Sequence, residues 1–144
     1  MPPMPKTETL SLDGVRILVV DDNEDAREIL DATFTHLGAT VATARSGYEA
    51  LDILGASDQH IIVSDLSMPG MDGLEFMTRV RARPGEAECP TPAIALSGFV
   101  QPENRERARR SGYQVFVAKP MDPLLLAQEV ARLAAPVAGR SRRS

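Results

Sequence analysis

Five short runs of β-branched and apolar residues recur along the chain, and segments with helical spacing separate them. The runs cover residues 15–20, 40–44, 61–64, 93–96 and 114–118. The first, third and fourth are almost continuously apolar, which is typical of strands covered on both faces. Strands that alternate with helices form a parallel sheet with right-handed crossovers and helices on both faces. The pattern therefore predicts an α/β fold: a single doubly wound domain, (βα)5, with a five-stranded parallel sheet.

The segments between the runs carry apolar residues three or four positions apart, as amphipathic helices do. Gly38 and Gly55 are expected to end the first two helices, and Asp122 is expected to cap the last helix, with Pro123 as its first residue. A fourth helix is predicted around 103–110, and this segment is almost entirely polar. The residues expected on buried helix faces are Ala26, Ile29, Leu30, Thr33, Leu37, Gly47, Ala50, Leu51, Leu54, Leu74, Met77, Val80, Arg81, Leu126, Val130 and Leu133.

Length and charge limit the class of protein. The 144 residues are enough for one domain, and the net charge of -4 argues against nucleic-acid binding through bulk charge. Cys89 is the single cysteine, so no intramolecular disulfide can form, and no apolar run is long enough to cross a bilayer. We expect a cytoplasmic protein that contacts neither membrane nor nucleic acid directly. The expected organisation is a flexible lead over 1–13, a folded domain over 14–135 and a flexible Arg-rich tail over 136–144.

Carboxylate, hydroxyl and ammonium side chains follow the ends of four of the predicted strands. They are Asp21 and Asp22 after the first strand, Asp65 after the third, Ser97 after the fourth and Lys119 after the fifth. Because function in such sheets lies at the carboxyl ends of the strands, these side chains are expected to converge. Three carboxylates together need a cation or a proton, and a site rich in oxygen ligands favours Mg²⁺. The set therefore predicts a site that receives a phosphoryl group on one aspartate.

Four segments resemble the receiver domain of two-component response regulators. They are residues 17–22 (ILVVDD), 63–73 (VSDLSMPGMDG), 95–98 (ALSG) and 117–120 (VAKP), in that order and at the expected strand ends. The resemblance covers about residues 14–135. It implies a flavodoxin-like sheet with strand order 2-1-3-4-5, similar to the chemotaxis receivers.

The resemblance also implies a role for each residue at the strand ends. Asp65 would be the phosphoacceptor, and Lys119 would pair with the phosphoryl oxygens. Asp22, Asp65 and the backbone carbonyl of Ser67 would bind Mg²⁺ directly, and Asp21 would act through a water molecule. In this family the peptide bond between Lys119 and Pro120 is typically cis.

Two further residues match the positions that change on phosphorylation in this family. Ser97 would bond the phosphoryl group, and Phe116 stands where the family has its switch aromatic, often a tyrosine. Phe116 lacks the tyrosine hydroxyl. The face built by the helix around 103–110, the strand 114–118 and the last helix would contact a protein target, and an arginine cluster lies on that helix: Arg105, Arg107, Arg109 and Arg110.

The expected partner is a histidine kinase or a histidine phosphotransfer protein that donates the phosphoryl group. The chain would then be a signalling receiver, not an enzyme beyond its own phosphorylation and dephosphorylation. Two alternatives remain open: an interaction module that is never phosphorylated, and a receiver segment cut from a hybrid histidine kinase. A flavin-binding protein is excluded because Asp21 and Asp22 would repel a phosphate, and an aspartyl phosphatase is disfavoured because Ser67 stands where its second aspartate is needed.

Overall fold

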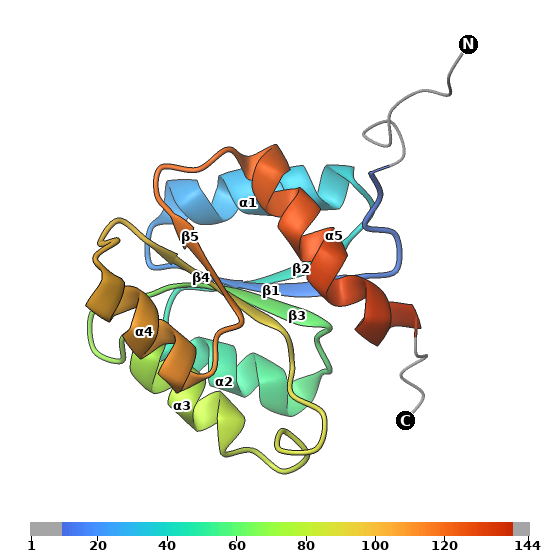
Figure 1. Ribbon diagram of the computed structural model, residues 1–144. Coiled ribbons are helices and arrows are strands. Elements are labelled where there is room, and N and C mark those ends of the chain that lie inside the picture. Colours follow the sequence, from blue (N-terminus) through green and yellow to red (C-terminus); the bar gives the residue numbers. More distant parts are fainter. Residues whose placement is uncertain (1–9, 140–144) are drawn as a thin grey trace.

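A parallel sheet of five strands forms the centre of the molecule, with helices on both faces (Figure 1). The computed structural model describes residues 10–139. The strands lie in the order β2-β1-β3-β4-β5, as predicted. The elements are β1 (Arg16–Val20), α1 (Glu24–His36), β2 (Thr40–Ala44), α2 (Gly47–Ala56), β3 (Ile61–Asp65), α3 (Gly73–Arg81), β4 (Ala93–Ser97), α4 (Pro102–Ser111), β5 (Val115–Ala118) and α5 (Pro123–Gly139).

Two apolar cores lie on opposite faces of the sheet. Helices α1 and α5 cover one face, and α2, α3 and α4 cover the other (Figure 1). Successive residues of a strand point to opposite faces, so Leu18 and Val20 join the core under α2 and α3, while Ile17 and Val19 join the core under α1 and α5. Strands β1 and β3 are therefore buried on both sides, which explains their continuous apolar sequence.

The five strands begin and end within one residue of the ranges predicted from the sequence. Asp65 is the last residue of β3, and Ser97 is the last residue of β4. Both residues are thus held by the strand ladder at the carboxyl edge of the sheet. The positions of Asp65 and Ser97 are therefore set by the sheet and not by the loops that follow.

Side-chain caps begin most of the helices. Asn23, Ser46 and Asp72 accept hydrogen bonds from backbone N–H groups in the first turns of α1, α2 and α3. Asp122 accepts a bond of 2.9 Å from the amide of Leu124, which confirms it as the cap of α5. The polar helix α4 is also confirmed; it runs from Pro102 to Ser111, and the capping residue Gly112 has a φ of 120°, which suits glycine.

Several sequence expectations on burial and on domain ends were wrong. Ile29 is 53% exposed, whereas Phe34, which the pattern did not select, is fully buried beside Leu30. In the segment before β1, the side chain of Leu12 is buried in the core. The backbone amide of Leu12 donates to the carbonyl of Leu37 at 2.8 Å. Residues 10–13 are therefore part of the folded domain and not a flexible lead. Helix α5 continues to Gly139, beyond the expected boundary at 135. The rest of the expected lead and tail, residues 1–9 and 140–144, lie outside the described residues.

Candidate functional site

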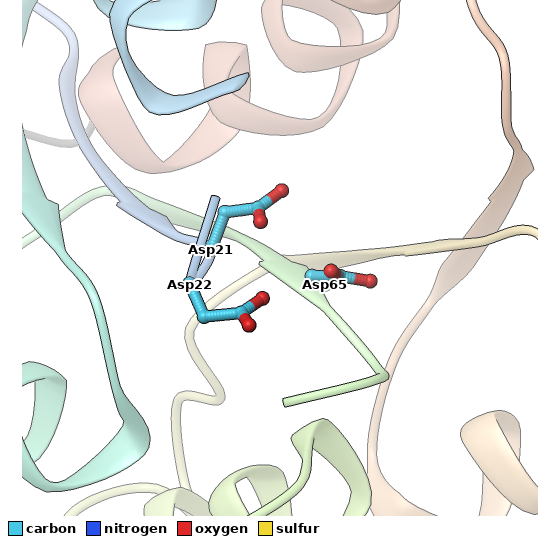
Figure 2. Close-up of side chains that lie close together, drawn as sticks. All are labelled: Asp21, Asp22 and Asp65. Atoms are coloured by element: carbon cyan, nitrogen blue, oxygen red, sulfur yellow. The ribbon is translucent and has the colours of Figure 1, made fainter. Parts of the chain in front are cut away.

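Three carboxylates meet at the ends of two neighbouring central strands. Strands β1 and β3 pair in parallel with Val20 opposite Ser64, so the residues that follow, Asp21 and Asp65, lie next to each other. One oxygen each of Asp21, Asp22 and Asp65 lie within 4.8 Å of one another. Figure 2 shows Asp21 and Asp22 at the end of β1 and Asp65 at the end of β3. The structure thus brings together the acidic residues that the sequence predicted to converge.

Lys119 is the cation of this cluster. Its Nζ lies 3.3 Å from Oδ2 of Asp65 and 3.4 Å from Oδ2 of Asp21. The backbone amide of Lys119 donates to the carbonyl of Ser97 at 2.8 Å, which fixes the end of β5 against the end of β4. The peptide bond from Lys119 to Pro120 is cis, as the family resemblance implied.

The two aspartates of β1 have different surroundings. Asp21 is almost fully buried, and its Oδ1 accepts a 2.9 Å bond from the amide of Asn23. The guanidinium of Arg27 donates to the backbone carbonyl of Asp21 at 2.8 Å and holds the turn between β1 and α1. Asp22 is exposed at the mouth of the cluster. Asp21 is thus a fixed part of the site, and Asp22 faces the solvent.

The surroundings of Asp65 disfavour its negatively charged form. Burial, and next the negative charge of Asp21, raise the pKa of Asp65 above its ordinary value of 3.8. Lys119 and the backbone amide of Ser67, which lies 3.3 Å from Oδ1 of Asp65, act in the opposite direction. The charged form of Asp65 is therefore incompletely compensated by the protein alone.

The residues present fit a divalent cation. Three clustered carboxylates face one ammonium group, which leaves negative charge that a cation would neutralise. All the side-chain atoms that could bind a metal here are carboxylate oxygens, which Mg²⁺ prefers as ligands. Mg²⁺ commonly binds through one or two carboxylates and retains several water molecules. The exposed position of Asp22 leaves the cluster open to such an ion.

Ser97 ends the strand that pairs with β3, and Phe116 lies one strand further on, in β5; both side chains have partners other than the carboxylates. The Ser97 hydroxyl accepts a 3.0 Å bond from the amide of Phe99, and its oxygen lies 3.4 Å from the Phe99 carbonyl. The ring of Phe116 is partly buried, and the guanidinium carbon of Arg105 lies 4.7 Å from its centre. This cation–π contact, reinforced by a 3.3 Å bond from Arg105 to the carbonyl of Val100, covers the ring from α4.

Two features near the site were not predicted from the sequence. A cleft beside Ser67 and Ser97 reaches α4, where Asn104 and Arg107 line it. The buried hydroxyl of Tyr113 donates to the backbone carbonyl of Gly73 at 2.8 Å, just beyond the loop that follows Asp65. No periodicity or motif relates these residues, because the contacts depend on how α3 and α4 pack together.

Comparison with known proteins identifies the family of the chain. Residues 17–131 match the family model of the response regulator receiver domain. The chain is 44% identical over 111 residues to an uncharacterized 14.6 kDa protein of Leptolyngbya boryana, covering 76% of this chain and 82% of that one. It is 33% identical over 116 residues to the regulator of RpoS of Escherichia coli, covering 81% of this chain but 33% of that protein.

A solved structure shows the same architecture. The chemotaxis response regulator CheY4 of Vibrio cholerae superposes with a TM-score of 0.77 and 30% identity, over 83% of this chain and 98% of that one. With the family match over most of its length, the chain belongs to the response regulator receiver domains. It is thus a receiver module of two-component signalling, with the flavodoxin-like fold predicted. Among residues 10–139, no helix has the length and apolarity needed to cross a membrane.

Proposed function

We propose that Asp65 accepts a phosphoryl group from a phosphohistidine of a histidine kinase or a histidine phosphotransfer protein, within a two-component phosphorelay. The observation that carries this proposal is the position of Asp65 beside one positive and two negative side chains. Its carboxylate lies 3.3 Å from Nζ of Lys119 and within 4.8 Å of the carboxylate oxygens of Asp21 and Asp22. The carboxylate that would act as the nucleophile thus lies beside an ammonium group and beside two carboxylates that would help to hold a metal ion.

In the proposed reaction a carboxylate oxygen of Asp65 attacks the phosphorus atom. The O–P bond forms while the N–P bond of the donor breaks, and the donor imidazole retains the electron pair and takes up a proton. Such transfers depend on positioning and on neutralising the charge of the phosphoryl oxygens. Lys119 is placed to bind one of these oxygens, because it already contacts the carboxylate that would carry the group.

Asp22, Asp65 and the backbone carbonyl of Ser67 would hold Mg²⁺, with Asp21 acting through water. When bound, the ion would supply further neutralising charge for the phosphoryl oxygens. The protein's own part is to keep these ligands in place. Asp21 is fixed by the amide of Asn23, and Asp65 by the amide of Ser67 and by the β3 ladder.

We propose that phosphorylation acts on a protein target through the face formed by α4, β5 and α5. The Ser97 hydroxyl would leave Phe99 to bond a phosphoryl oxygen, which would free the loop that connects β4 to α4. Phe116 belongs to β5 of this face and lacks a hydroxyl, but Arg105 links its ring to Val100 of the same loop. This pair gives the loop and β5 a direct connection.

The test of this function is phosphorylation with a small donor. The purified protein, incubated with acetyl phosphate and Mg²⁺, should gain the mass of one phosphoryl group, and Asp65→Asn should gain none. Asp58→Asn, which changes an exposed aspartate at the opposite end of β3, is the matched control and should be modified like the wild type. A wild type that takes up no group, or a group that persists in Asp65→Asn, would refute the proposal.

The alternative of an interaction module that is never phosphorylated makes the opposite prediction for the same experiment. The alternative of a segment from a hybrid histidine kinase concerns the surrounding protein and leaves the chemistry unchanged. We place the receiver domain from about residue 10, where Leu10 and Leu12 join the core, to the end of α5 at Gly139. We propose a cytoplasmic location, where a kinase with access to ATP would act as the donor.

A further inference from the structure

Tyr113 makes a buried hydrogen bond that connects two distant parts of the molecule. Its hydroxyl donates to the carbonyl of Gly73 at 2.8 Å, although the two residues are 40 positions apart. Tyr113 is only 3% exposed and belongs to the core under α3 and α4. Burial raises the pKa of its hydroxyl above the ordinary value, so the group remains a proton donor at neutral pH.

Gly73 ends the loop that starts at the phosphoacceptor. Its amide donates to the carbonyl of Leu66 at 2.9 Å, so residues 66 and 73 close a loop that contains Ser67. The backbone of Gly73 also packs directly on Asp65, because a Cβ atom at Gly73 would lie 2.4 Å from the Asp65 carbonyl oxygen. Any displacement of Gly73 is therefore transmitted to the backbone of Asp65 and to the Ser67 loop.

The other end of the Tyr113 connection is rigid. The amide of Tyr113 donates to the carbonyl of Ala108, in the last turns of α4. The guanidinium of Arg81, at the end of α3, donates to the carbonyl of the preceding residue, Gly112, at 2.6 Å. The short connection between α4 and β5 is thus fixed to α3 at both ends of that helix.

We propose that Tyr113 is a positioning residue for phosphorylation: its hydroxyl holds the loop from Asp65 to Gly73 in the arrangement that the reaction needs. The inference rests on the proposed function of Asp65. The hydroxyl donates to the Gly73 carbonyl, and its effect would reach Asp65 through the close backbone contact between Gly73 and Asp65. Loss of one such bond corresponds to a change of about five-fold in a local equilibrium.

The decisive variant is Tyr113→Phe, which removes the hydroxyl and retains the ring in the core. Gly73 is the first residue of α3, so its carbonyl keeps a place in the helical hydrogen-bond ladder and the variant should fold. In the metal-free protein, we expect the amide hydrogens of residues 66–73, which all but Pro69 carry, to exchange with solvent about five-fold faster. The rate constant for phosphorylation by acetyl phosphate should fall by a similar factor.

Two controls separate positioning from a general loss of stability. Tyr48→Phe removes the hydroxyl of the other tyrosine, which is 58% exposed, and should change neither readout. Val130→Ala opens a cavity in the core under α5, on the opposite face of the sheet, and should lower global stability without a selective change in the loop.

The proposal is overturned if Tyr113→Phe leaves either loop exchange or phosphorylation at the wild-type value, or if Val130→Ala changes both as strongly. A wild type that takes up no phosphoryl group would refute the proposed function instead. In that case amide exchange would still report whether Tyr113 holds the loop.

Discussion

At the scale of single residues, the site combines charges that oppose one another. The raised pKa of Asp65 means that the folded protein favours the protonated carboxyl more than the unfolded chain does. Its charged form therefore costs stability, and this cost develops as the pH rises from the ordinary value of 3.8 through the raised value in the folded protein. The proposed phosphoacceptor is thus a residue whose negative charge lowers the stability of the fold.

Asp65→Asn should consequently stabilise the metal-free protein at pH 7. Because the variant removes a charge that burial and Asp21 disfavour, we expect a higher free energy of unfolding, measured with urea. The gain should shrink as the pH is lowered toward 3.8, where Asp65 is protonated in the wild type too. Asp58→Asn should show no such gain, and a destabilised Asp65→Asn at pH 7 would contradict the sign of the effect.

At the scale of elements, an ion pair of low exposure ties α3 to the loop before β4. Arg81 Nη1 lies 2.7 Å from Oε1 of Glu86, whose side chain is 7% exposed. Glu86 also accepts bonds from the amide and the hydroxyl of Thr91, just before β4. Because Arg81 binds the carbonyl of Gly112 as well, one guanidinium joins three segments.

Arg81→Met should lower the free energy of unfolding by about 3 kcal/mol, because the buried carboxylate of Glu86 loses its cation. The matched control is Arg79→Met, two residues earlier on the same helix. Arg79 pairs with Glu75 at 2.7 Å, but both side chains are about half exposed, so we expect a cost of about 0.5 kcal/mol or less. If the two variants lost the same free energy of unfolding in urea denaturation, burial of the Arg81–Glu86 pair would not contribute to stability.

The strands could be predicted from the sequence more accurately than the buried faces of the helices. Strands β1, β3 and β4 could be located closely because each is apolar on both faces, and that pattern does not depend on the rest of the fold. The buried face of α1 was harder to predict. Apolar residues occupy more of its surface than the sheet covers, so Ile29 is exposed while Phe34 is buried.

At the scale of the whole molecule, the site could be predicted because it follows from the order of the strands. Residues at the ends of parallel strands meet at one edge, so Asp21, Asp65 and Lys119 converge whatever the details of helix packing. The bond from Tyr113 to Gly73 could not be predicted in this way. It depends on the relative placement of α3, α4 and the sheet, for which no local pattern exists.

Because the carboxylates belong to two central strands, binding of Mg²⁺ at the site should stabilise the entire fold. A ligand that binds only the folded state at 100 times its dissociation constant adds about 2.7 kcal/mol. We expect a gain of this size for the wild type at constant ionic strength, measured by urea denaturation with and without Mg²⁺. Asp22→Asn should abolish most of the gain while changing metal-free stability little, because Asp22 is exposed. If Asp22→Asn gained as much as the wild type, the ion would be binding elsewhere, and the cluster of Asp21, Asp22 and Asp65 would not be the metal site.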